Sequence, residues 1–138
     1  MAKISGPLLD RIDLHIEVPA VKYKELVSKD HTETSENVRQ RVIAAREIQM
    51  KRFSLRKGMF CNADMQSKDI QSYCKIDSAG EELLKMAITK LELSARAYDR
   101  ILKVGRTIAD LANSKEVKPE HTSEAIQYRS LDRNLWNG

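Results

Sequence analysis

Two arginines of the 138-residue chain stand out, and one of them, Arg96, lies where a phosphate group could bind. Arg96 lies two residues after Ser94, at the expected start of a helix over about residues 95–112. Free backbone N–H groups and the helix dipole favour an anion there, and a guanidinium can donate two hydrogen bonds to phosphate oxygens. A surface ion pair of Arg96 with Glu92 or Asp99 is the simpler alternative, and chemistry alone favours it. Arg11 precedes an expected strand and indicates little by itself.

A second group of arginines lies on a helix expected over residues 36–53. From Glu36 to Lys57, both included, there are seven basic residues and two acidic ones. The candidates for contact with a nucleic-acid backbone are Arg39, Arg41, Arg46 and Arg52. Few aromatic residues interleave with them for base stacking, so a solvated surface is the favoured interpretation.

The chain lacks the motifs of a self-sufficient enzyme. It contains no G-x-x-x-x-G-K-[ST], G-x-G-x-x-G, H-E-x-x-H or G-x-S-x-G pattern. His15, His31 and His121 are far apart in sequence, so we expect solvated histidines and no metal site. Cys61 and Cys74 match no metal or redox spacing; two reduced thiols are the default expectation, and spacing alone leaves a disulfide open.

Composition favours a helical protein. Hydrophobic residues make up 41% of the chain, charged residues 32% and aromatic residues only 5%, which argues against a β-sandwich. The net charge of +4 permits contact with phosphate without indicating it strongly. No apolar run approaches the roughly 20 residues that cross a bilayer, and the segment MAKISGPLLDR does not have the apolar core expected of a signal peptide. We therefore expect a protein that is located in the cytoplasm and has no membrane as a partner.

The expected elements are one strand followed by helices. Apolar and polar residues alternate over residues 12–18, and Pro19 ends this strand pattern. A strand needs a neighbour, so either two copies pair through it or its sheet lies upstream. Helices are expected at 36–53, from Ser67 to Tyr73, after a capping box of Ser78 and Glu81, at 95–112, and from about Pro119 to Tyr128. The fold class is mainly α: a small bundle of four or five helices preceded by one β-strand.

Three segments of the chain resemble a known family. ISGPLLDRIDLHIEVP, LSARAYDRILKVGRTIADL and SEAIQYRSLDRNLW are similar to the C-terminal third of the magnesium-chelatase-like AAA+ ATPases, the group that contains the competence protein ComM. The resemblance extends over essentially the whole chain from Ile4. It implies that residues 1–20 are the end of the AAA+ core and residues 21–138 the helical lid, with the strand left over from the core sheet. Relatives often have Ala where Gly105 stands.

The resemblance also implies roles for the two arginines. Arg11 corresponds to the arginine finger, which acts in trans on the neighbouring subunit's nucleotide, and Arg96 corresponds to sensor 2, which contacts the γ-phosphate. ATP and Mg²⁺ would be the cofactors of the full-length protein, with an upstream AAA+ core and identical subunits in a hexameric ring as partners. The phosphate-binding loop and Mg²⁺ ligands would come from upstream. We therefore expect this fragment alone to bind neither cofactor and to be inactive.

The function that the resemblance implies is ATP-driven DNA remodelling, by helicase or branch-migration activity, in natural transformation. DNA is then a further expected partner. One alternative is a fragment of a magnesium chelatase ATPase subunit that acts in porphyrin metalation. Another is a stand-alone helical DNA-binding module.

Overall fold

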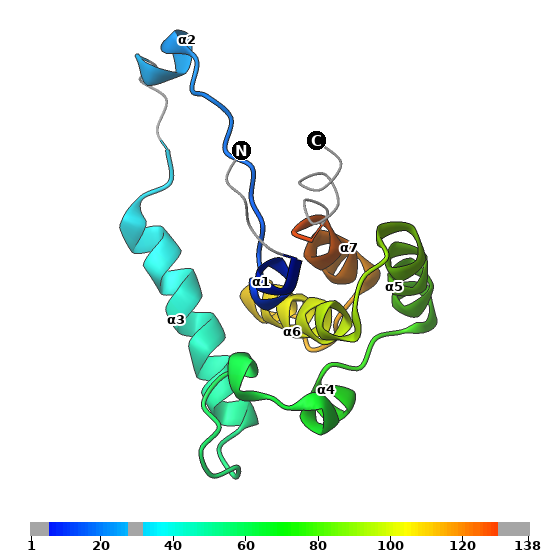
Figure 1. The fold of residues 1–138 in the computed structure, drawn as a ribbon. Helices are drawn as coiled ribbons and strands as arrows, with labels where there is room; N and C mark the ends of the chain where they lie inside the picture. The colour runs from blue at the N-terminus through cyan, green and yellow to red at the C-terminus, as the bar shows by residue number, and fades with distance from the viewer. Residues whose placement is uncertain (1–5, 28–31, 130–138) are drawn as a thin grey trace.

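The computed structural model describes residues 6–27 and 32–129, which are helical over most of their length (Figure 1). Residues 130–138, which include the last part of the third motif, and His31 lie outside the described residues. The helices in chain order are α1 (Gly6–Arg11), α2 (Tyr23–Leu26), α3 (Ser35–Arg52), the 3₁₀ turn η1 (Asn62–Asp64), α4 (Ser67–Tyr73), α5 (Ser78–Leu91), α6 (Ala95–Leu111) and α7 (Pro119–Gln127). The expected small helical domain is confirmed.

The strand expected over residues 12–18 is wrong for the described chain. This segment connects α1 to α2 without strand pairing, and it has one backbone hydrogen bond, from the His15 N–H to the Tyr128 carbonyl at 2.8 Å. The alternating sequence suits a strand, but no second strand in the described ranges can pair with it; their one β-bridge joins Ile76 and Val117. Burial is also the reverse of the expected pattern, because His15 is buried whereas Leu14 and Ile16 are exposed.

Local capping explains where three of the helices begin. The Thr34 hydroxyl accepts a hydrogen bond from the Asn37 N–H at the start of α3, and Ser94 does the same for Ala97 at the start of α6. At α5 the cap is the Asp77 carboxylate, which accepts from the Gly80 N–H at 2.8 Å. The expected cap at Ser78 is therefore one residue too late, since Asp and Ser are equally good at this position.

Helix α6 is the centre of the bundle. It packs against α1, α3, α4 and α7, as the wide apolar arc of its sequence predicts. The core residues around it are Phe53, Met65, Ile70, Cys74, Leu84, Ile101, Leu102 and Ala125. A Cβ on Gly105 would lie 3.6 Å from Val117 Cγ1 and 3.9 Å from Ala125 Cβ, which are ordinary contacts. The α6–α7 contact therefore has room for an alanine at this position, and glycine there costs about 0.5–1 kcal/mol of helix stability.

The N-terminal end of helix α3 points away from the bundle (Figure 1). Its C-terminal part is fixed, because Ala45 and Gln49 are buried and Phe53, directly after the helix, is packed against Tyr73. Toward its start, an apolar groove of about 700 Å³ separates Val38 and Val42 of α3 from Val104 and Ile108 of α6. No helix within residues 6–27 and 32–129 has the length and apolar character needed to span a membrane.

Candidate phosphate-binding site

Arg96 occupies the first turn of α6, as the sequence predicts. Its side chain is exposed, and it makes no ion pair or hydrogen bond among the described residues. Asp99, one of the partners considered for Arg96, instead accepts a hydrogen bond from the Ser67 hydroxyl at 2.8 Å. The simpler alternative of a surface ion pair is thus not observed in the described chain. The Arg96 guanidinium is available to an anion at the positive end of α6.

Arg11 and Arg96, which are 85 positions apart in the sequence, line one recess of about 560 Å³. The recess lies between the end of α1, the first turns of α6 and the segment that leads into α4. Arg100 and Lys103 add two further positive charges, and Asp99 is the one carboxylate among the lining residues. Like Arg96, Arg11 has no ion-pair partner within the described chain. An excess of cations in a recess of this size suits a polyanion such as a phosphate chain.

Arg100 and Lys103 are site residues that the sequence prediction missed. With Arg96 they follow the i, i+4, i+7 spacing of one helix face, so the signal was present in the sequence. Both are partly held by other groups. Arg100 forms an ion pair with Asp13, and the Lys103 ammonium donates to the Ala63 carbonyl at 3.1 Å. Lys103 thus contributes positive charge to the recess from a fixed position, whereas Asp13 partly offsets the charge of Arg100.

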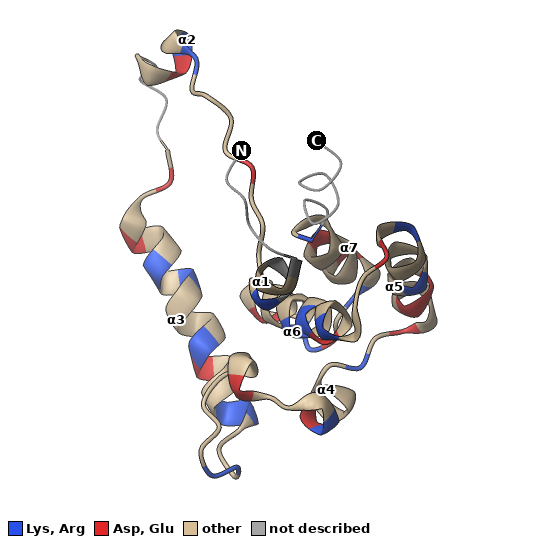
Figure 2. Ribbon diagram, viewed as in Figure 1, with Lys and Arg blue, Asp and Glu red and all other residues tan. Residues whose placement is uncertain are grey.

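The arginines of α3 divide into two groups. Arg39, Arg41 and Arg46 are exposed, and Arg41 forms an ion pair with Glu33 at 2.8 Å. Basic residues recur along this helix in Figure 2. Arg52 is different, because only 15% of its side chain is exposed and it is paired with Asp110.

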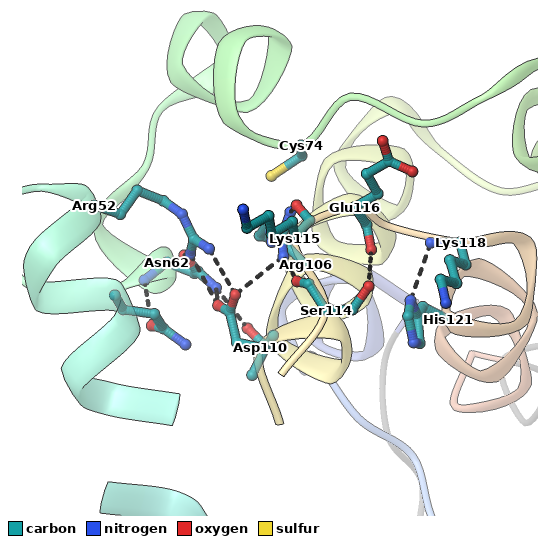
Figure 3. Close-up of polar contacts among 12 residues, drawn as sticks. Arg52, Asn62, Cys74, Arg106, Asp110, Ser114, Lys115, Glu116, Lys118 and His121 are labelled. Carbon is teal, nitrogen blue, oxygen red and sulfur yellow. Dashed lines mark hydrogen bonds and ion pairs between the residues drawn. The ribbon is translucent and has the colours of Figure 1, made fainter. Parts of the chain in front are cut away.

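Asp110 is the centre of a buried polar cluster that joins α3 to α6 (Figure 3). Arg52 donates to both carboxylate oxygens of Asp110, from Nη1 at 2.9 Å and from Nη2 at 2.6 Å. The Asn62 amide donates to the same carboxylate at 3.0 Å. The hydrogen bond to Asp110 raises the pKa of Arg52, so the guanidinium stays charged. Because the Asp110 side chain is 0% exposed, its charge depends on these partners for stabilisation.

Arg106 completes this cluster from within α6. Its Nη2 lies 3.2 Å from Asp110 Oδ1, and its terminal nitrogens also donate to the carbonyls of Ser114 at 2.7 Å and Lys115 at 2.9 Å. The side chain therefore holds the loop after α6 against the helix (Figure 3). The cluster has a structural role. Arg52 belongs to it, unlike Arg39, Arg41 and Arg46, which are exposed on α3.

The described histidines and cysteines form no metal site. No group of three or more His, Cys, Asp or Glu side chains in residues 6–27 and 32–129 is arranged to hold a metal ion. His15 and His121 are 8% and 6% exposed, so the expectation of solvated histidines is wrong for both. Cys61 and Cys74 are free thiols, as expected by default. Burial raises the pKa of Cys74 to about 11, so this thiol is protonated at neutral pH.

Comparison with known proteins places the chain in a family of AAA+ ATPases. Residues 32–129 match the family described as "Magnesium chelatase, subunit ChlI C-terminal", and residues 1–26 match "Magnesium chelatase, subunit ChlI". The chain therefore belongs to the magnesium-chelatase family of AAA+ ATPases and is a C-terminal lid fragment. The two matched ranges meet between residues 26 and 32, whereas the division at 20/21 remains a prediction.

Several curated relatives match almost the whole chain. Competence protein ComM of Haemophilus influenzae is 45% identical over 134 residues, which are 96% of this chain and 25% of that protein. Uncharacterized protein YifB of Escherichia coli is 42% identical over 135 residues, with 96% and 26% covered. Uncharacterized protein Rv2897c of Mycobacterium tuberculosis is 33% identical over 129 residues, with 94% and 25% covered. The chain thus spans about a quarter of these relatives, less than the third that the resemblance suggested.

Proposed function

We propose that the chain is the lid of a ring-forming AAA+ ATPase and supplies two arginines to ATP hydrolysis. Arg96 acts as sensor 2 on the γ-phosphate, and Arg11 acts as the arginine finger. The observation that carries this proposal is the cationic recess at the start of α6, lined by both guanidiniums with no competing ion pair in the described chain. The two positions come from separate sequence motifs, yet they line the same recess.

The charge of the recess matches what hydrolysis of ATP requires. Negative charge develops on the oxygens of the transferred phosphoryl group, and a guanidinium at hydrogen-bond distance stabilises it. A trans arginine contributes roughly 10³–10⁵ in rate in well-studied cases. The cations of the recess suit phosphate oxygens but not Mg²⁺. The described residues include no cluster of three or more His, Cys, Asp or Glu side chains that could hold a metal ion. The Mg²⁺ ligands and the phosphate-binding loop would therefore come from another part of the full-length protein.

The position of Arg11 beside Arg96 raises the question of whose nucleotide it contacts. An arginine finger reaches the neighbouring subunit, whereas sensor 2 contacts the nucleotide of its own subunit. In the ring we place Arg11 at the subunit boundary, so that the recess opens toward both nucleotides. This arrangement makes the two roles separable by mixing subunits.

Mixing Arg11→Ala subunits with subunits that lack a functional phosphate-binding loop tests the trans role. Each variant alone is expected to be nearly inactive. In a mixed ring the second variant supplies an intact Arg11 to a nucleotide held by the first, so part of the ATPase activity should return. Steady-state ATP hydrolysis against mixing ratio measures this. Absence of any recovery would show that Arg11 acts within its own subunit or only supports the fold.

We further propose that DNA is the substrate that the motor moves. Support comes from the relative named as a competence protein and from Arg39 and Arg46, which are exposed on one side of α3. Arg41 contributes less because Glu33 already neutralises it. Arg52 is omitted because its pairing with Asp110 occupies it. The competing proposal is a chelatase subunit, which the matched family descriptions favour.

DNA stimulation of ATPase activity separates these two proposals. We expect double-stranded or branched DNA to raise the turnover of the full-length protein, and this effect to weaken as salt rises, because bound phosphates release counterions. Removing two charges with Arg39→Gln and Arg46→Gln should reduce the slope of the logarithm of the DNA-binding constant against the logarithm of the salt concentration by roughly 1–2. The matched control is Lys75→Gln with Lys85→Gln, two exposed lysines away from α3. Turnover that is insensitive to DNA at low salt would favour the chelatase.

A further inference from the structure

The chain segment directly after Arg11 is fastened to the helical bundle at three successive places. The Ile12 carbonyl accepts a hydrogen bond from the Arg129 guanidinium. The Asp13 carboxylate forms an ion pair with Arg100 of α6. The His15 N–H donates to the Tyr128 carbonyl, just after α7, at 2.8 Å. These contacts are with two different parts of the bundle, α6 and the end of α7, and they all lie within four residues of Arg11.

The three contacts differ in how firmly they hold. Arg129 is fully buried, and a hydrogen bond from a buried charged donor is among the strong ones. The Asp13 side chain is 56% exposed and that of Arg100 29%, so this ion pair is partly screened by water. Arg129 therefore anchors the segment, while the Asp13–Arg100 pair sets its direction. Arg100 stands one helical turn beyond Arg96 on the same face of α6.

We propose that Arg100 and Asp13 are positioning residues that hold Arg11 in a fixed place relative to Arg96. This inference rests on the proposed function of the two arginines. Because the segment after Arg11 is bonded to α6 and α7 and not only to residues preceding it, a rotation of the helical domain carries Arg11 with it. Arg96 senses the nucleotide of its own subunit, and Arg11 serves the neighbour. The fastened segment thus couples the nucleotide state of one subunit to hydrolysis in the next.

The variant that tests this coupling is Asp13→Asn in the full-length protein. Asp13 does not line the recess, so the change breaks the ion pair without removing a cation from the site. We expect kcat to fall roughly tenfold with KM for ATP changed less than about twofold, as for loss of a group that acts in the transition state. Hydrogen exchange of the peptide that contains His15 should become faster. Glu17→Gln, an exposed change in the same segment, is the control and should alter neither measurement.

Two further arms make the outcome decisive. The exchanged pair Asp13→Arg with Arg100→Asp should restore the exchange rate, because the ion pair forms in reverse, whereas kcat should stay low because the change at Arg100 replaces a cation of the recess with a carboxylate. Asp13→Asn should also be rescued in mixed rings, as Arg11→Ala is, whereas a change at Arg96 should not be. Unchanged exchange in Asp13→Asn would show that the segment is not held by this pair. Faster exchange with unchanged kcat would show a purely structural contact and overturn the proposal.

The exchange measurement is independent of the ATPase assignment. If Arg11→Ala leaves ATP hydrolysis unchanged, the proposed function of Arg11 fails, and hydrogen exchange still reports whether the segment is fastened. If Arg11→Ala abolishes hydrolysis and Asp13→Asn does not lower it, the arginine finger stands and the positioning role is wrong.

Discussion

Replacing Arg96 with alanine should lower ATP turnover of the full-length protein by about 10²–10³-fold, the usual cost of removing one transition-state hydrogen-bond donor. The side chain is exposed and has no ion-pair partner in the described chain, so its loss breaks no contact that supports the fold. A cation in the first turn of a helix is disfavoured by a few tenths of a kcal/mol by the helix dipole. The midpoint temperature of thermal unfolding of Arg96→Ala should therefore equal that of the parent or be slightly higher.

Two companion variants make this result specific. Arg96→Lys keeps the charge but loses the planar guanidinium that donates two parallel hydrogen bonds, so it should recover only part of the activity. Lys85→Gln removes an exposed positive charge from α5 and should change turnover less than about twofold. Turnover of Arg96→Ala within a factor of two of the parent would contradict the sensor role.

Replacing Asp110 with alanine should cost about 3–5 kcal/mol of the free energy of unfolding, the range measured when one partner of a buried ion pair is removed. Two guanidiniums, of Arg52 and Arg106, would lose their carboxylate, and the Arg106 side chain is 6% exposed. The Asn62 amide would lose an acceptor as well. Urea unfolding of the 138-residue chain, followed by circular dichroism, measures the change in midpoint.

The matched control for Asp110→Ala is Glu33→Gln. This change breaks the Arg41–Glu33 ion pair, which has a similar N···O distance of 2.8 Å but exposed side chains. Exposed pairs contribute only about 0–1 kcal/mol. If the two variants lost comparable stability, the buried cluster at Asp110 would stabilise the fold no more than an exposed ion pair does, and the fixed position of α3 would need another cause.

The helices could be predicted from the sequence because their signals are local. Ser94 and the apolar spacing after it give the start and the buried face of α6 without knowledge of the rest of the fold. The cap of α5 was misplaced by one residue, since Asp77 and Ser78 are adjacent and both cap well. The strand at residues 12–18 was wrong because alternation predicts only which side chains share a face. Whether a strand forms depends on a partner strand.

The candidate site was only partly predictable for a similar reason. Arg11 and Arg96 were found through a resemblance that assigns them roles, yet their common recess appears only in three dimensions. Arg52 looked like its neighbours on α3, because nothing in the local charge pattern points to Asp110, which lies 58 residues later. Arg100 and Lys103 had a readable helical spacing, but a basic face on a helix is usually solvated and carries little information alone.

The attachment of α3 at one end has a mechanical consequence. The helix has 18 residues and is therefore about 27 Å long, and its C-terminal half is fixed by the Arg52–Asp110 pair and by the burial of Ala45 and Gln49. A tilt of about 10° around Ala45 would move Thr34, about 16 Å away along the helix, by about 3 Å. Small changes in the angle of the domain would thus be amplified at the far end of α3, as in a lever arm.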